Sequence, residues 1–159
     1  MNRIIAVFGM CVLAGFTTGQ ASAEEQFKNG QDLTGTWRIT ATIPAGVPVC
    51  PGVTPCTYLA VSTVSSDGNV VQSANIPNTS VGHGVWKRVS QRTFQMVALY
   101  FRFDKDGNPL GTSETTIDAQ LDAAGRNAVG SFTAVVRDLA GVELLGYDGT
   151  VTAIRMVVP

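Results

Sequence analysis

His83 is the only histidine of this 159-residue chain, and it lies between two glycines in Gly82-His83-Gly84. Histidine is the side chain whose ordinary pKa puts its charge change near neutral pH, so His83 is a candidate catalytic proton donor or acceptor. The flanking glycines permit unusual backbone angles and indicate a junction between a loop and a strand. The structural alternative is a histidine at a barrel rim that bonds to a loop carbonyl.

A second group of residues suits ligand binding. Tyrosine fits an apolar pocket because its ring tolerates burial while its hydroxyl seeks a hydrogen-bond partner. Tyr100 and Tyr147 are the candidates of this kind. The other predicted ligand contacts are Trp86, Ser113 and Thr115.

Two arginines, Arg88 and Arg102, are expected to be exposed. If either faced inward, it would need an anionic ligand or a carboxylate partner, because an unpaired charge is costly to bury.

Other chemistries have less support. A single histidine without a Gly-x-Ser-x-Gly elbow argues against nucleophilic hydrolysis. Glu114 and Asp118 share one face of a predicted strand, which we interpret as a solvent face rather than an acid–base pair. Asp104, Asp106 and Asn108 resemble the opening of a calcium loop, but the terminal glutamate is missing, so a hairpin turn is predicted. We expect no metal and no cofactor.

The first 23 residues have the pattern of a secretory signal peptide. Arg3 supplies the positive charge, residues 4–16 are almost wholly apolar, and Ala21-Ser22-Ala23 fits the small-residue cleavage site. We therefore expect a secreted or periplasmic protein without membrane insertion, in which residues 24–159 form a single domain.

Cys50 and Cys56 are the two cysteines that remain after cleavage. Export places them in an oxidising compartment, and the prolines and glycine between them favour a tight loop. We predict a disulfide that staples this loop and does no redox chemistry.

Charged residues make up only 14% of the sequence, and no block of like charge occurs. Nucleic-acid binding needs clustered lysine and arginine, so this partner is excluded. A surface so poor in charge is consistent with a homo-oligomer or with an apolar ligand.

Hydrophobic residues alternate with polar ones throughout the mature chain, which predicts strands rather than helices. Short turns separate the segments, so sequential strands should be antiparallel neighbours. Closing about eight strands removes the exposed edges, and we predict an all-β, eight-stranded antiparallel up-and-down β-barrel, with a two-sheet β-sandwich as the alternative. The predicted strands are 33–43, 57–65, 70–74, 85–90, 93–103, 109–121, 128–138 and 142–158.

The interior of such a barrel holds either side chains or one small ligand. One face of 111–119 and one face of 128–136 carry residues that are small for a core, so they would leave a cavity if they point inward. Segment 93–103 is apolar on both faces, which predicts that a partner subunit or another part of the chain covers its outer side.

The stretch Gly35-Thr36-Trp37 resembles the Gly-x-Trp signature on the first strand of the calycins, the class of lipocalins, fatty-acid-binding proteins and avidins. This resemblance implies that Trp37 packs at the closed end of a barrel and that Arg155 lies over its indole ring. The architecture is also similar to the allene-oxide-cyclase and dirigent barrels, which steer a reactive substrate in an apolar cavity without a cofactor. Both likenesses concern the fold more than the function.

Three functions follow as expectations. The first is an exported barrel that binds a small apolar or amphipathic molecule in its interior. The second is a cofactor-free isomerase or cyclase of the allene-oxide-cyclase type, with His83 or a tyrosine as the polar group. The third is a filled barrel that serves as an envelope or interaction protein without a ligand.

Overall fold

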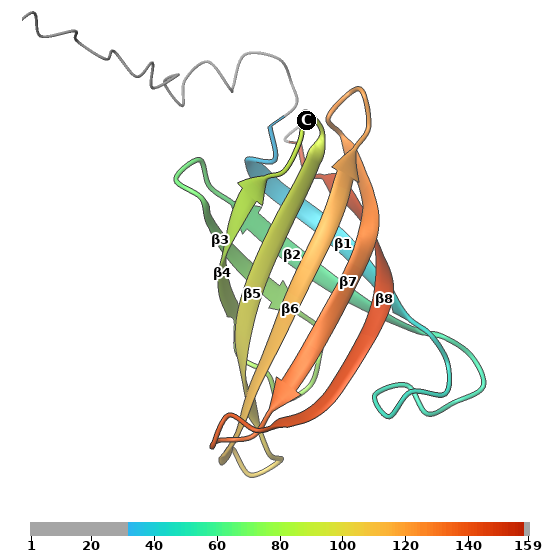
Figure 1. The fold of residues 1–159 in the computed structure, drawn as a ribbon, viewed down its shortest axis with the longest axis vertical. Coiled ribbons are helices and arrows are strands. Elements are labelled where there is room, and N and C mark those ends of the chain that lie inside the picture. Colours follow the sequence, from blue (N-terminus) through green and yellow to red (C-terminus); the bar gives the residue numbers. More distant parts are fainter. Residues whose placement is uncertain (1–31, 158–159) are drawn as a thin grey trace, which may run out of the picture.

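The computed structural model describes residues 32–157, and the expected signal peptide, residues 1–23, lies outside the described residues. Within the described part, eight antiparallel strands follow one another in chain order, and the last pairs with the first to close a barrel (Figure 1). The prediction of an all-β up-and-down barrel is confirmed, and the sandwich alternative is wrong. The strands are β1 (Gly35–Ile43), β2 (Cys56–Val64), β3 (Asn69–Ala74), β4 (Gly82–Arg88), β5 (Thr93–Phe103), β6 (Pro109–Leu121), β7 (Asn127–Arg137) and β8 (Glu143–Arg155).

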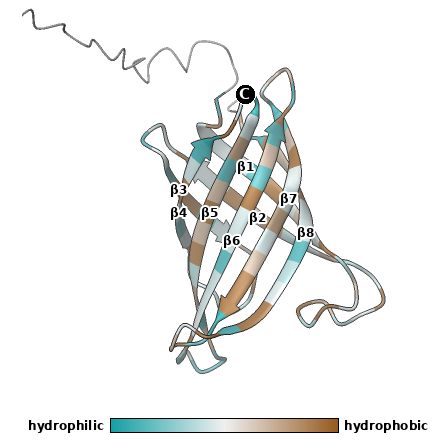
Figure 2. Ribbon diagram, viewed as in Figure 1, coloured by the Kyte–Doolittle hydropathy of each residue, from teal (hydrophilic) through white to brown (hydrophobic). Residues whose placement is uncertain are grey.

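Alternation along each strand decides which side chains face the interior, because successive residues of a strand point to opposite faces. In β1, Trp37, Ile39 and Ile43 are buried, whereas Arg38 is exposed. Figure 2 shows the same pattern as hydrophobic and hydrophilic bands that follow one another along single strands. The inward residues of all eight strands meet in one core. No helix among residues 32–157 is long and apolar enough to span a bilayer.

Aspartates build the turns that join the later strands. Between β5 and β6, the carboxylate of Asp104 accepts hydrogen bonds from the backbone N–H groups of Asp106 and Asn108, both at 2.8 Å. The side-chain hydrogen bond from Asn108 is the main cause that lowers the pKa of Asp104. Asp122 and Asp138 accept backbone N–H groups in the same way in the next two turns. The segment that resembles a calcium loop is therefore a hairpin turn.

β4 begins three residues earlier than the sequence predicted. Gly82, His83 and Gly84 belong to the strand, and His83 is in register with Val71 of β3 and Leu99 of β5. Neither glycine has a positive φ, so the expectation that they supply unusual backbone angles in a loop is wrong.

Close packing explains the two glycines of β4 instead. A Cβ atom on Gly82 would lie 2.5 Å from Cε1 of the Tyr100 ring, and one on Gly84 would lie 1.8 Å from the carbonyl oxygen of Val97. Non-bonded carbon atoms prefer separations of about 3.5–4.0 Å. Gly82 therefore makes room for an aromatic ring of β5, and Gly84 lets the two backbones approach.

One end of the barrel is closed by Trp37 and Arg155. Trp37 is 2% exposed, and its indole Nε1 donates a hydrogen bond of 2.7 Å to the carbonyl of Leu33. The guanidinium carbon of Arg155 lies 4.5 Å from the centre of the indole ring, and the same group donates hydrogen bonds to the carbonyls of Asp32 and Gly125. This is the contact that the calycin resemblance implied, and it seals the barrel at the end where β1 starts and β8 ends.

The outer face of β5 is open to solvent in the single chain. Leu99 is 41% and Phe101 is 58% exposed, so no part of residues 32–157 covers them. The sequence suggested a partner subunit or another part of the chain as the cover, and both stay predictions.

Candidate functional site

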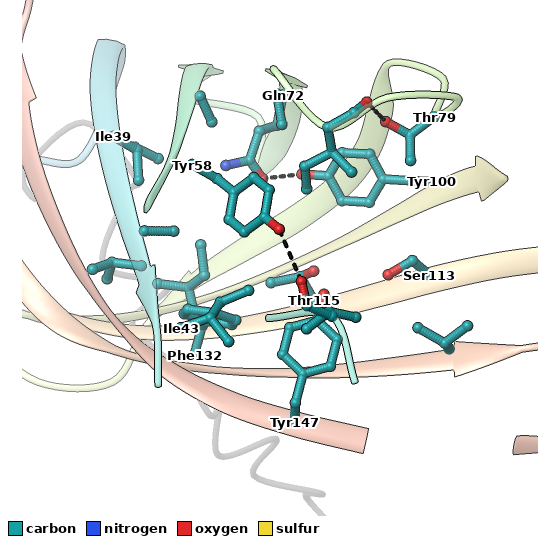
Figure 3. A pocket seen from close by; sticks show the side chains of 18 of the residues that line it. Ile39, Ile43, Tyr58, Gln72, Thr79, Tyr100, Ser113, Thr115, Phe132 and Tyr147 are labelled. Carbon is teal, nitrogen blue, oxygen red and sulfur yellow. Dashed lines mark hydrogen bonds between the residues drawn. The ribbon is translucent and has the colours of Figure 1, made fainter. Parts of the chain in front are cut away.

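A cavity of about 320 Å³ occupies the half of the barrel opposite Trp37 (Figure 3). Its mouth lies where the β1–β2 and β3–β4 loops contribute Val49, Ile76, Pro77 and Thr79. Most of the wall is apolar. The polar side chains in the wall are those of Tyr58, Gln72, Thr79, Tyr100, Arg102, Ser113, Thr115 and Tyr147.

Small inward residues on β6 and β7 create part of this space, as the sequence suggested. Ser113 and Thr115 of β6 line the cavity, and Thr115 is paired with Ala98 of β5 on one side and with Ala134 of β7 on the other. Both alanines are buried, and neither fills the volume that a larger core residue would take. The interior is thus packed at the closed end and hollow at the other.

Four of the five predicted ligand contacts meet in this cavity: Tyr100, Tyr147, Ser113 and Thr115. The fifth, Trp86, lies elsewhere, in the packed half. Its Nε1 donates a hydrogen bond of 2.8 Å to the carbonyl of Ser65, and its ring centre lies 5.7 Å from that of Phe94. Trp86 is therefore in a position to stabilise the core rather than to contact a molecule in the cavity.

His83 does not reach the cavity. It lies on the outer face of β4 and is exposed, while its neighbours Gly82 and Gly84 face inward. Glu114 and Asp118 are also on the outside, as the sequence analysis expected: Glu114 lies 3.9 Å from the guanidinium of Arg137, and Asp118 accepts a hydrogen bond from Gln95. None of these three titratable groups is in the cavity wall.

Tyr100 and Gln72 form the buried polar pair of the cavity. The Tyr100 hydroxyl donates a hydrogen bond to Oε1 of Gln72, and both residues are buried (Figure 3). Burial is the main cause that raises the pKa of Tyr100 above its ordinary value. The phenol is therefore neutral at physiological pH, and it fixes the orientation of the Gln72 amide.

Tyr58 connects the cavity to the disulfide loop. Its hydroxyl donates a hydrogen bond of 3.2 Å to the carbonyl of Val49, which lies one residue before Cys50. The predicted disulfide is present, with the Cys50 and Cys56 sulfurs 2.04 Å apart. The staple and this hydrogen bond hold Val49 in place at the mouth.

Tyr147 differs from the other two tyrosines because its hydroxyl has no hydrogen-bond partner among residues 32–157. Its ring packs edge-on against Phe132, with the ring centres 6.2 Å apart. Burial is the main cause that raises the pKa of Tyr147, and the positive charge of Arg102 opposes that rise. The neutral hydroxyl of Tyr147 is therefore available to donate a hydrogen bond in the cavity that Arg102 also lines.

Arg102 contributes the one charged side chain that the described residues place in the cavity wall. It is half-buried, and no carboxylate from the described part of the chain pairs with it. The expectation that Arg102 is exposed is wrong: alternation along β5 puts Arg102 on the same inward face as Tyr100.

The sequence analysis also missed Tyr58 and Gln72. The signal was available for both, because Tyr58 lies on the same face of β2 as buried Ser62 and Val64, and Gln72 lies two residues after buried Val70 on β3. A polar residue at an inward position of a strand is the pattern that would have identified them.

No protein-family model matches this chain, and no curated protein matches its sequence. The closed eight-stranded barrel is compatible with a calycin-like fold. The fold and the cavity define the class: an up-and-down β-barrel with one sealed end and one hollow end.

Proposed function

We propose that this protein binds a small apolar or amphipathic molecule in the open half of its barrel. The observation that carries the proposal is the cavity of about 320 Å³, whose volume lies at the lower end of the range for small-molecule sites. Its wall is mainly aliphatic and aromatic, with a few hydroxyl groups, an amide and one guanidinium, which is the composition that ligand pockets typically have. A filled barrel would not leave this space.

The cavity supports binding better than catalysis. Its titratable side chains among the described residues are three tyrosines and Arg102, and His83 lies outside. A general base works best when its pKa is close to the operating pH, and the pKa values of Tyr100 and Tyr147 are raised away from it. We therefore favour a binding protein over a cyclase or isomerase on the same fold.

Export and assembly complete the proposal. The Cys50–Cys56 disulfide is consistent with a secreted or periplasmic location, where such bonds persist. The Trp37–Arg155 contact supports a calycin-like architecture. The exposed Leu99 and Phe101 on β5 are compatible with a homo-oligomer, in which a partner subunit covers them.

A matched pair of substitutions tests the proposal. Thr115 faces the cavity and Thr116 faces outward, so Thr115→Phe fills the cavity while Thr116→Phe adds the same bulk outside. Native mass spectrometry of protein purified from an exporting host should show a retained small molecule in the wild type and in Thr116→Phe, and its loss in Thr115→Phe. The same spectra give the subunit number. Equal binding by both variants, or no binding of any apolar molecule by the wild type, would contradict the proposal.

A further inference from the structure

We propose that the ligand carries a single anionic head group, which binds Arg102 near the mouth while its apolar body lies deeper, against Ile39 and Phe132. The inference rests on the proposed function, because it specifies what kind of molecule the cavity holds. It is argued from the charge of the wall, from the backbone that positions Arg102, and from the donors in the wall.

The charge of the wall favours an anion. Among residues 32–157, Arg102 is the one charged residue that lines the cavity, and no aspartate or glutamate of this part lines it. A guanidinium does not lose its proton in a protein, so it cannot escape the cost of partial burial by becoming neutral. Since no described carboxylate pairs with Arg102, an oxyanion on the ligand would supply the missing partner.

Strand pairing fixes the backbone of Arg102 on both sides. The register between β5 and β6 shifts between Arg102 and Phe103, which marks a β-bulge, a device that redirects side chains at barrel rims. Opposite Arg102, Gly111 has a φ of 132°, which a residue with a side chain rarely adopts. On its other side, Arg102 forms a β-bridge with Thr79 of the β3–β4 loop. Arg102 is thus held from two sides beside the mouth.

Donors without protein partners also line the cavity. Among residues 32–157, the hydroxyl groups of Tyr147, Ser113 and Thr115 make no hydrogen bond. A neutral phenol or hydroxyl can donate to an oxyanion, whereas a carboxylate in the wall would repel it. Arg102 and Tyr147 line the same cavity, so its wall offers both a cation and a neutral donor.

The deep part of the cavity suits a hydrocarbon body. Ile39, Ile117, Phe132 and Val151 are all buried and line the inner wall. Figure 3 shows Ile39 on the opposite side of the cavity from Ser113 and Thr79, and Phe132 beside Tyr147. A molecule with an anion at one end and an apolar chain at the other would match both regions at once.

Isothermal titration calorimetry with three ligands of equal chain length tests the inference: decanoate, decyl phosphate and decanol. Wild-type protein should bind one or both anions about tenfold or more tightly than decanol, because a charge-assisted hydrogen bond contributes at least that factor. The comparison of decanoate with decyl phosphate shows which head group the site accepts. In Arg102→Gln, the anions should bind no better than decanol.

Two further variants distinguish the loss of the Arg102 charge from a loss of the folded structure. Arg102→Lys retains the charge and should retain a preference for the anions, although it loses the bidentate geometry. Arg38→Gln removes an arginine from the outer face of β1 and should bind all three ligands like the wild type. Thermal unfolding confirms that each variant is folded.

The outcomes separate the two proposals. If wild-type protein binds decanol as tightly as both anions, the anionic head group is wrong and the binding function stands. If no decyl ligand binds and no retained molecule is found by mass spectrometry, the binding function itself is wrong. If the anion preference survives in Arg102→Gln, the assignment to Arg102 is overturned.

Discussion

The three tyrosines of the chain, Tyr58, Tyr100 and Tyr147, all line the same cavity, yet their hydroxyl groups have different roles. Tyr58 and Tyr100 each donate a hydrogen bond within the protein, to a backbone carbonyl and to an amide oxygen. Tyr147 makes none within residues 32–157. At the scale of single residues, two of the tyrosine hydroxyl groups therefore contribute to structure, and the third is available to a ligand.

Tyr100→Phe should lower the free energy of unfolding by about 1–3 kcal/mol, because it leaves the buried Gln72 amide oxygen without its donor. Tyr147→Phe removes a hydroxyl without a described partner and should change that free energy by less than about 0.5 kcal/mol. Urea unfolding of both variants measures the difference. Equal losses would show that the Tyr100–Gln72 hydrogen bond does not stabilise the fold.

The same two phenols predict a loss of stability at alkaline pH. Burial raises the pKa of Tyr100 and of Tyr147, whereas in the unfolded chain both titrate near their ordinary value of about 10. Above that pH the unfolded chain releases protons that the folded protein keeps, so stability is full below pH 10 and falls as the pH rises further. Urea midpoints measured from pH 8 to pH 11 should decline beyond 10. The decline should be smaller in the Tyr100→Phe, Tyr147→Phe double variant, and an identical decline would contradict the assignment.

At the scale of elements, β4 and β5 pack closely because Gly82 of β4 has no side chain where the ring of Tyr100 from β5 lies. Gly82 is buried against Tyr100, and the ring occupies the space that a Cβ atom would need. The bulge at Arg102 and the bridge to Thr79 tie the same end of β5 to β6 and to the β3–β4 loop. Contacts among β4, β5, β6 and the β3–β4 loop therefore determine the position of this part of the cavity wall.

Gly82→Ala should destabilise the protein by about 1–3 kcal/mol, because the added methyl group overlaps the Tyr100 ring and forces it to move. Gly146→Ala is the matched control, since its nearest neighbour would be the flexible Glu143 carboxylate at 3.4 Å. Chemical denaturation compares the two variants. Near-ultraviolet circular dichroism should detect a changed tyrosine environment in Gly82→Ala only. A control variant that is as unstable as Gly82→Ala would indicate a general cost of replacing strand glycines.

At the scale of the whole molecule, the two halves of the barrel have separate tasks. The closed half is a packed core around Trp37, Phe94 and Leu121, all of them at most 2% exposed. The open half contains the cavity and the loops that frame it. The pairing of β1 with β8 closes the barrel around both halves (Figure 1).

Trp37→Ala should lower the free energy of unfolding by about 3–5 kcal/mol, since it removes a large buried side chain together with its contact to Arg155. Trp37→Phe is the milder variant and keeps most of the buried volume. Because Trp37 does not line the cavity, Trp37→Phe should bind decanoate with the wild-type affinity wherever it is folded. A strong loss of binding in that variant would show that the two halves are coupled.

The sequence by itself determined the strands and the closed barrel, because alternation with a period of two and short turns are local properties that leave few topologies. It also indicated the disulfide, the inward small residues, and Tyr100 and Tyr147 in the wall. Only the tertiary structure decided that His83 faces outward and that Arg102 faces inward. The first depends on Gly82 and Gly84 packing against β5, and the second on β5 keeping its alternation as far as Arg102, where the strand pairs with β6 and bridges to Thr79. Contacts between residues that are far apart in the sequence produce no periodic pattern along the chain. The orientation of such side chains therefore follows only from the tertiary structure.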